Sequence, residues 1–281
     1  MTAYKQIAES GDQISEESYA FLQQHVYRES GIVIESGKHY LLEARLMPIV
    51  RRESLRTLND LCALLKATEN QPLKREVVEA MTTNETLFFR DTAPFEALKQ
   101  VIVPEFVKDR QQSQRLSFWS AAASTGQEAY SLAIMLAEMG LSHWSIRILG
   151  TDLCAKVLAK ATLGRYAQVE VNRGLPVTCL IKYFDRVGLE WQVREPIRRM
   201  AAFEQFDLRQ SMRGKGPFDV ILCRNVLIYF DTETKRKILD EMRRTLAPGG
   251  YLLLGAAETT LGLTDAFVRR QIGSAIFYQL R

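Results

Sequence analysis

Apolar residues in the first eighty positions repeat every three or four residues, a pattern typical of amphipathic helices. The first predicted helix begins after Ser15, a favourable N-cap followed by two glutamates, and ends at Gly31. A second helix is predicted next, with a kink or a late start because Pro48 interrupts its apolar stripe. A third opens at Thr57, and a fourth covers residues 72–81. This part is therefore predicted to be all helical.

After about residue 115 short apolar runs alternate with helical repeats. Predicted strands cover 116–122, 146–150, 218–223, 251–254 and 275–280, predicted helices cover 127–139, 155–161 and 232–246, and a turn is expected at 248–250. This order is typical of a doubly wound α/β domain with a parallel sheet, whose ligand binds at the carboxyl ends of the strands. The domains are predicted as 1–80 and 81–281.

Residues 167–206 interrupt that alternation. They contain two short apolar runs, 189–193 and 200–203, that are typical of strands, without a clear crossover helix. We interpret 167–206 as a small inserted β-subdomain.

Composition adds little to this picture. The 281 residues include 37 basic and 33 acidic side chains, a net charge of +4 that is too small to indicate nucleic-acid binding. At 47% hydrophobic and 25% charged residues the chain is an ordinary globular protein. No apolar run reaches the roughly 20 residues that span a bilayer, and the N-terminus lacks a signal-peptide pattern. Four scattered cysteines predict a reduced, cytoplasmic protein without disulfide or metal.

Two segments at predicted strand ends could bind a cofactor. Residues 120–128 lead from a strand into a helix through small side chains, which would let a ligand approach the backbone. Asp152 ends the next strand, where an acid can bind ribose hydroxyls. A tight turn with nothing bound, and a helix cap at Asp152, are the structural alternatives.

Two further segments combine polar and aromatic residues. Arg224 and Asn225 directly follow the buried strand 218–223, and Tyr229 comes four residues later. Tyr229 could lie over a reacting centre or simply pack in the core. The run 81–91, at the domain junction, could be hinge packing or could cover the cofactor cleft.

Four segments together closely resemble the signature segments of the CheR family of chemotaxis receptor methyltransferases. They are 83–90 (TNETLFFR), 120–128 (SAAASTGQE), 150–152 (GTD) and 223–231 (CRNVLIYFD), and they occur in the family's order along essentially the whole chain. The resemblance implies a Rossmann-like class I methyltransferase sheet with a helical N-terminal domain. It also implies methyl transfer from S-adenosylmethionine to glutamates of bacterial chemoreceptors, giving S-adenosylhomocysteine and methyl esters for adaptation.

Carried over by position, the resemblance implies a set of cofactor contacts: Asn84, Thr86, Arg90, Glu128, Asp152, Asp207, Leu208, Arg224 and Asn225. It also implies catalytic roles for Arg90, which would hold a carboxylate, and for Tyr229, which would orient the nucleophile or the methyl group. One departure is Gln127, where many relatives have a second acid.

The chemistry agrees with this reading. A glutamate with a pKa near 4.3 is already ionised at neutral pH, so its methylation needs alignment and water exclusion rather than a general base. No histidine is placed as a base, which disfavours a hydrolase or a lactate-type dehydrogenase. The alternatives are an RNA or small-molecule methyltransferase on the same fold, and a cofactor-binding sensor without turnover.

The resemblance also assigns a partner. Arg45, Arg52 and Arg56 are spaced as one helical stripe, and with Arg51 they would dock acidic methylation helices of the receptor, although a solvated surface is the alternative. Residues 1–80 carry a net charge of −2, so only this stripe is basic.

Some members bind a receptor C-terminal pentapeptide through a longer loop than this chain has at 184–190. We therefore predict independence from that peptide. We also expect a monomer that binds no nucleic acid and does not insert into a membrane.

Overall fold

The computed structural model describes residues 13–281, which divide into two compact units. One unit ends at Thr83 and also includes the short segment Tyr229–Asp231. The other comprises Asn84–Ile228 and Thr232–Arg281. The division falls three residues beyond the boundary expected from the sequence, and Tyr229–Asp231 joins the helical unit although the sequence assigns it to the α/β domain. Among the described residues, no helix is both long enough and apolar enough to cross a membrane.

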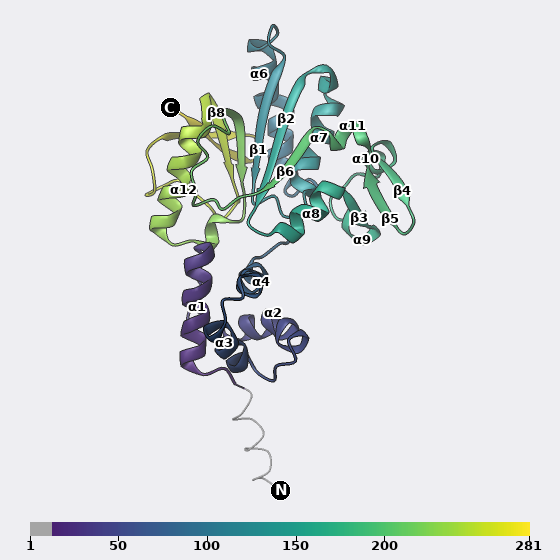
Figure 1. Ribbon diagram of the computed structural model, residues 1–281. Coiled ribbons are helices and arrows are strands. Elements are labelled where there is room, and N and C mark those ends of the chain that lie inside the picture. Colours follow the sequence, from purple (N-terminus) through teal and green to yellow (C-terminus); the bar gives the residue numbers. More distant parts are fainter. Residues whose placement is uncertain (1–12) are drawn as a thin grey trace. The chain divides into compact units, whose positions relative to one another are not determined.

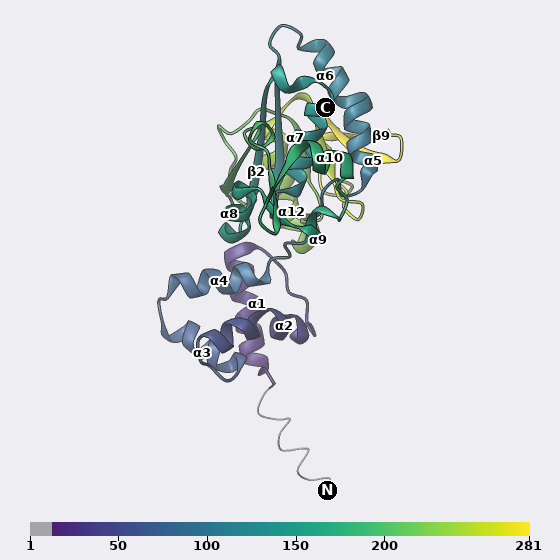
Figure 2. The same ribbon diagram turned by 90° about the vertical axis from the view of Figure 1, so that its right-hand side faces the viewer.

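The helical unit consists of four helices, shown in Figure 2: α1 (Glu16–Ser30), α2 (His39–Arg52), α3 (Leu58–Ala67) and α4 (Gln71–Met81). The predicted caps are confirmed, because Ser15 accepts from the amide of Ser18 and Thr57 forms a capping box with Asp60. Pro48 lies inside α2, which starts at His39 rather than late. The apolar faces enclose a separate core that includes Leu22, Leu46 and other fully buried side chains.

The α/β unit is built on a seven-stranded sheet in the order β6-β2-β1-β7-β8-β10-β9 (Figure 1). The strands in that order are β6 (Ala201–Gln205), β2 (Ser145–Asp152), β1 (Arg115–Ala121), β7 (Phe218–Cys223), β8 (Leu246–Leu254), β10 (Ala275–Leu280) and β9 (Phe267–Ile272). The first five are mutually parallel, and β10 runs antiparallel to both of its neighbours, β8 and β9. The predicted doubly wound sheet is confirmed.

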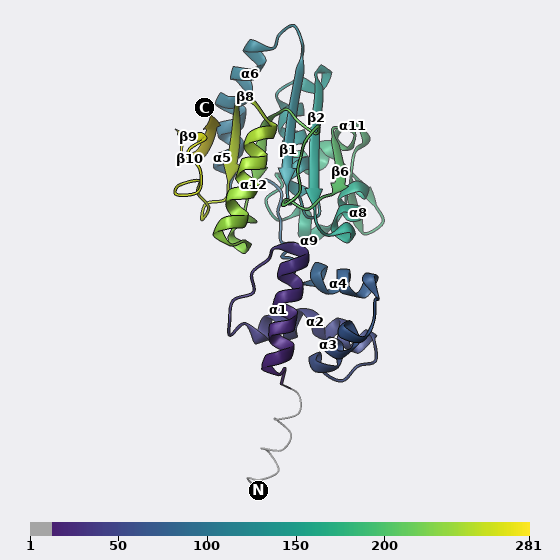
Figure 3. The same ribbon diagram turned by 60° about the vertical axis from the view of Figure 1, so that its left-hand side comes forward.

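Helices cover both faces of this sheet, and Figure 3 shows α12 in front of the strands and α5 behind them. The helices and short turns of this layer are α5 (Thr92–Ala97), the π-helix η1 (Leu98–Ile102), α6 (Val103–Asp109), α7 (Gln127–Glu138), η2 (Leu141–His143), α8 (Ala155–Leu163), η3 (Leu227–Tyr229) and α12 (Thr232–Thr245). Helices α5 and α6 and strand β9 were not predicted from the sequence.

A small antiparallel sheet in the order β3-β5-β4 corresponds to the predicted insertion. It contains β3 (Arg165–Ala167), β4 (Phe184–Val187) and β5 (Glu190–Val193), with α9 (Gln168–Val171), α10 (Val177–Tyr183) and α11 (Glu195–Arg198) around them. The predicted strand near 200–203 is real but misplaced, because β6 pairs with β2 at the edge of the large sheet. The expected turn at 248–250 is also wrong, since these residues lie within β8 at a register irregularity, where a strand tolerates proline.

Candidate functional site

The carboxyl ends of β2, β1, β7 and β8 lie side by side at one edge of the parallel sheet. Chain order reverses between β1 and β7, because β1 connects to β2 on one side while β7 connects to β8 on the other. A parallel α/β sheet binds its ligand at such a reversal, outside the strand ends. The loops after β1 and β7 are therefore the first place to look for function.

The loop after β1 is shaped by its backbone. Ala122 and Ser124 both have positive φ, at 58° and 51°. The amide of Ser124 donates to Oδ2 of Asp152 at 2.9 Å, and its hydroxyl donates to the carbonyl of Asn84 at 2.7 Å. Asp152 and Asn84, which the resemblance assigned to the cofactor, are thus brought together by Ser124, which sequence reasoning missed.

Gly126 closes this loop with a φ of 91°. A Cβ placed on it would lie 2.9 Å from Cβ of Ala161 and 3.1 Å from the ring of Phe203. The missing side chain therefore allows α7 to pack against α8 and β6. The sequence predicts that the small residues of this loop let a ligand approach the backbone. At Gly126, however, the absence of a side chain serves helix packing.

Arg224, directly after β7, joins three segments of the α/β unit. Its Nη1 donates to Oε2 of Glu128 at 3.0 Å, and its Nη2 donates to Oδ2 of Asp91 at 2.7 Å and to the carbonyl of Arg90 at 2.8 Å. The side chain of Arg224 is 3% exposed and that of Glu128 is 12% exposed. Glu128 also accepts from the hydroxyl of Ser120 at 2.7 Å. Two predicted site residues, Glu128 and Arg224, therefore form a nearly buried ion pair.

The junction segment has two distinct halves. Phe88 is fully buried and packs edge-on against Tyr166 and Phe184. Arg90 and Thr86 are only half-buried. The segment thus combines core packing inside the α/β unit with polar groups beside Arg224.

Asp207 and Leu208 follow β6. The amide of Phe206 donates to the carbonyl of Asp152 at 2.9 Å, so this segment lies beside the end of β2. The carboxylate of Asp207 forms a two-point ion pair with Arg209. Asp152 also accepts from the amide of Cys154 at 3.0 Å. Helix α8 begins at Ala155 with Cys154 as its N-cap and without a side-chain cap, so Asp152 is not the N-cap of that helix and the helix-cap alternative is wrong.

Two buried polar atoms at this edge have no hydrogen-bond partner among residues 13–281: Nε of Arg224 and Oδ1 of Asn225. Buried polar groups in proteins are normally paired, so orphaned ones point to a ligand. One is a cationic donor and the other is an acceptor. The amino-acid end of S-adenosylmethionine offers a carboxylate and an ammonium, which match these two atoms. The residues present therefore fit the cofactor that the resemblance implies.

Tyr229 is half-buried rather than a core residue. Its carbonyl accepts from the amide of Val33 at 2.9 Å, and the next residue, Phe230, forms a β-bridge with Ile32. The hydroxyl of Tyr27 in α1 donates to Oδ2 of Asp231 at 2.8 Å. These contacts account for the place of Tyr229–Asp231 within the helical unit.

The predicted basic stripe is not continuous. Arg45 donates to the carbonyls of Met81 and Thr82 at 2.5 and 2.9 Å, so it caps the carboxyl end of α4. Arg56 lies beyond α2, which ends at Arg52, so the expected single helical stripe is wrong. Arg51, Arg52 and Arg56 are exposed, and Arg52 forms ion pairs with Glu53 and Glu76.

Glu258 is the most important residue that sequence reasoning missed. Its carboxylate accepts hydrogen bonds from backbone amides of the loop after β7. It lies four residues past the end of β8, at the same sheet edge as Arg224. The rule that found Arg224, a polar residue after a buried strand, could have found Glu258 if it had been applied to β8.

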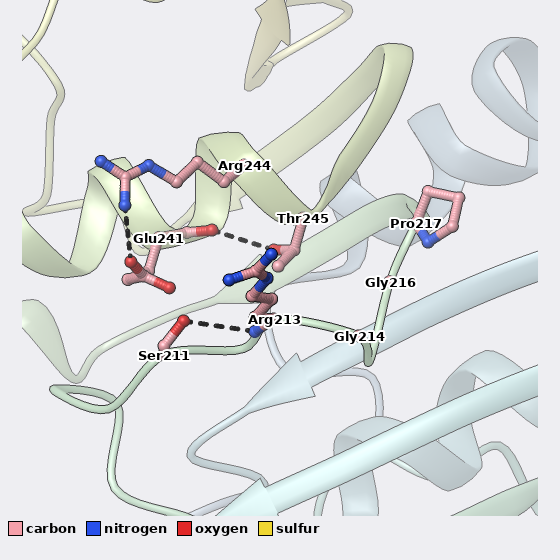
Figure 4. Close-up of a pocket in the computed structure, with 8 residues that line it drawn as sticks. All are labelled: Ser211, Arg213, Gly214, Gly216, Pro217, Glu241, Arg244 and Thr245. Carbon is pink, nitrogen blue, oxygen red and sulfur yellow. Dashed lines mark hydrogen bonds and ion pairs between the residues drawn. The ribbon is translucent and has the colours of Figure 1, made fainter.

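A cavity of about 490 Å³ lies away from these loops (Figure 4). Arg213, Glu241 and Arg244 line it, together with residues that precede β7. It is therefore at the amino end of β7, the edge opposite the site, and none of the predicted site residues lines it.

Comparison with known families identifies both units. Residues 84–276 match the model described as "CheR methyltransferase, SAM binding domain", and residues 17–82 match the "CheR methyltransferase, all-alpha domain". Within the part of the chain that the structure describes, no group of three or more His, Cys, Asp or Glu residues is placed to hold a metal ion.

Curated relatives match nearly the whole chain. Chemotaxis protein methyltransferase Cher2 of Pseudomonas putida is 40% identical, over 89% of this chain and 93% of the relative. Chemotaxis protein methyltransferase 1 of Pseudomonas aeruginosa is 42% identical over the same shares. The chemotaxis protein methyltransferase of Vibrio parahaemolyticus is 39% identical, over 95% of this chain and 98% of the relative.

Proposed function

This chain belongs to the CheR methyltransferase family, and we propose that it methylates glutamate side chains of bacterial chemoreceptors. Its α/β unit is a SAM-binding methyltransferase domain. The product would be a glutamyl methyl ester on a cytoplasmic receptor helix, which places the reaction in the cytoplasm, together with S-adenosylhomocysteine.

The proposed reaction is a direct displacement. When bound, S-adenosylmethionine supplies a methyl group on a positively charged sulfur. One oxygen of the receptor glutamate forms a bond to the methyl carbon while the carbon–sulfur bond breaks and its electron pair stays on sulfur. No proton moves, because a carboxyl with a pKa near 4.3 is already ionised. The protein has to align the carboxylate behind the methyl group and exclude water.

The described residues divide this work. Asp152, Asp207 and Leu208 lie beside the end of β2 and would hold the adenosine, with Asn84 and Thr86 on the junction segment. Glu128 orients Arg224 through their ion pair. Arg90 would hold the substrate carboxylate, and Tyr229, four residues after Asn225, would orient it or the methyl group.

The orphaned pair Nε of Arg224 and Oδ1 of Asn225 is the observation that carries this proposal. It offers complementary partners for a zwitterionic amino acid at the sheet edge where the fold binds cofactors. None of the histidines in the described part of the chain belongs to this edge as a base: His143 lies in η2 before β2, and His25 and His39 belong to the helical unit. Substrates that need deprotonation, such as amines or hydroxyls, are therefore less suited to the site than carboxylates.

The test uses methyl-labelled S-adenosylmethionine with receptor-rich membranes, followed by mild alkali. Carboxyl methyl esters release volatile labelled methanol, which is the expected result. Label that stays on protein after alkali would contradict the proposal and indicate N- or C-methylation. RNA in place of membranes tests the main alternative substrate, and an Asn225→Ala variant controls for dependence on the site.

We further propose that Arg51, Arg52 and Arg56 dock acidic receptor helices, whereas Arg45 serves α4. Charge reversal of the three should raise the KM for receptors about tenfold at low salt, with the difference shrinking as salt screens the charges. A triple variant with Lys66→Glu on α3 and Lys74→Glu and Arg75→Glu on α4 changes the net charge by the same amount and is the matched control. An unchanged KM across the salt titration would remove the docking role.

Independence from a receptor pentapeptide stays a proposal. The β4–β5 hairpin turns through only Gly188 and Leu189, which supports the short-loop interpretation. Calorimetry with a receptor-tail peptide is expected to detect no tight binding, and a submicromolar Kd would refute the proposal.

A further inference from the structure

We propose that Glu258 is a positioning residue for methyl transfer, which holds the loop after β7 and so sets the direction of the Asn225 side chain. This inference rests on the proposed function of the site. Glu258 would not touch cofactor or substrate itself.

The carboxylate of Glu258 accepts four backbone hydrogen bonds. Its Oε2 accepts from the amides of Gly255 at 2.7 Å and Asn225 at 2.8 Å. Its Oε1 accepts from the amides of Val226 at 2.9 Å and Ile228 at 3.3 Å. Backbone N–H groups that converge on one ionised carboxylate form strong, charge-assisted bonds. Glu258 therefore fixes three residues of the β7 loop and the end of β8 with one side chain.

The backbone at Asn225 needs such support. Its φ is 57°, in the left-handed region that non-glycine residues adopt at a cost. Glu258 holds the amide of Asn225 and that of Val226, so it binds both sides of the left-handed residue. A turn back to an ordinary φ would break these bonds.

Gly255 provides a second, independent observation. A Cβ on it would lie 2.7 Å from Oε2 of Glu258, 2.8 Å from the amide nitrogen of Asn225 and 2.9 Å from its Nδ2. The end of β8 therefore packs directly against the Nδ2 side of the Asn225 amide. The other end of the same amide, Oδ1, is the buried acceptor without a partner in the described structure.

These contacts define a chain of action from Glu258 to the cofactor. Glu258 fixes the backbone, and the backbone and Gly255 fix the Asn225 amide. When the cofactor is bound, Oδ1 of Asn225 would accept from its ammonium group. The amide of Ile228, which Glu258 also binds, directly precedes Tyr229 in the chain. Loss of Glu258 should therefore affect both cofactor affinity and turnover.

The experiment is a double-mutant cycle between Glu258→Gln and Asn225→Ala, read by calorimetric binding of S-adenosylhomocysteine. Each single variant should weaken binding about tenfold, because a buried hydrogen bond to a charged group is lost or misaligned. If Glu258 acts through Asn225, the double variant should also be only about tenfold weaker, since the second change removes a contact already lost. A hundredfold loss in the double variant would mean independent effects and would overturn the proposal.

Variants separate positioning from folding. Glu258→Asp keeps the charge on a shorter side chain and should fall between wild type and Glu258→Gln, and it replaces Glu258→Gln in the cycle if that variant does not fold. Glu195→Gln, an exposed glutamate of α11 paired with Arg198, is the matched control and should bind normally. Binding by Glu258→Gln within twofold of wild type, with an unchanged circular dichroism spectrum, would also overturn the proposal.

Turnover gives the second readout. In Glu258→Gln, kcat should fall about tenfold while the KM for receptor stays within about twofold, since the receptor-binding surface is unchanged. The binding cycle needs no receptor. If wild-type protein releases no methanol from receptor membranes, the proposed function fails while the coupling between Glu258 and Asn225 is still measured.

Discussion

The loops after β1 and β7 leave adjacent parallel strands at the same sheet edge, yet they are built differently. In the first, residues 122–126 present mostly backbone and small side chains. In the second, Arg224 and Asn225 each carry one buried atom, Nε and Oδ1, that lacks a partner among residues 13–281. The two loops therefore differ in the kind of group that they present at the sheet edge.

Both loops are held by a carboxylate from the neighbouring strand on the outer side. Asp152, the last residue of β2, binds the amide of Ser124 in the first loop. Glu258, past the end of β8, binds three amides of the second. The carboxylate of Glu258 thus holds the second loop at three backbone amides, whereas Asp152 holds the first loop at one.

The largest expected effect on stability comes from removing the side chain of Arg224. Arg224→Met should lower the free energy of unfolding of the α/β unit by about 3–5 kcal/mol, because Glu128 keeps a nearly buried charge without its partner. Urea denaturation followed by circular dichroism measures the change. Arg244→Met, which removes an exposed arginine from α12, should cost less than about 1 kcal/mol. Equal losses in the two variants would mean that the second loop depends no more on its charges than the protein surface does.

The first loop should instead be sensitive to added volume. Gly126→Ala should lower the free energy of unfolding by about 2–3 kcal/mol, through its positive φ and the clash with Ala161. Gly140→Ala has a similar φ but open space around it, so it should cost only about 1 kcal/mol. Thermal unfolding of both variants separates backbone strain from packing. If Gly126→Ala is no worse than Gly140→Ala, the packing explanation fails.

Sequence reasoning found what local pattern encodes. The caps at Ser15 and Thr57, the strand 218–223 and the polar pair that follows it all depend on neighbouring residues alone. The order of strands and helices then defines the fold class, and the fold class places the polar pair at the ligand-binding edge.

The rest depends on contacts between distant parts of the chain. Glu258 binds a loop 30 to 33 positions earlier, and no local pattern predicts that contact. Arg45 fits a basic stripe by spacing, but its partners are carbonyls 36 and 37 residues away. Strand β6 was assigned to the insertion because the insertion itself separates it from β2, its partner in the sheet.

The interior at the start of the second loop should show a pH effect. Burial, with the nearby charges of Glu258 and Glu128, raises the pKa of the Cys223 thiol well above its usual value. The folded state therefore keeps this proton when the unfolded chain has lost it, so stability is full below pH about 8.5 and declines as pH rises further. The expected loss is at most about 1.4 kcal/mol per pH unit.

Urea midpoints at pH 7.5 and 9.5 test this, in a range below tyrosine ionisation. Cys223→Ala should show a smaller decline than wild type, and Cys179→Ala, which alters a half-buried thiol, should change the decline less. An identical decline in wild type and Cys223→Ala would mean that the thiol has the same protonation state in the folded and the unfolded chain. That result would contradict the prediction.

The smallest effect concerns the far end of the second loop, where Tyr27 donates to Asp231. Tyr27→Phe removes one partly exposed hydrogen bond, so it should reduce kcat only about threefold, with unfolding changed by less than about 1 kcal/mol. Tyr40→Phe, an exposed tyrosine of the same unit, is the control and should retain full kcat. If Tyr27→Phe equals wild type, the Tyr27–Asp231 hydrogen bond does not help to position Tyr229. If it matches Glu258→Gln, the helical unit contributes as much to positioning Tyr229 as the sheet does.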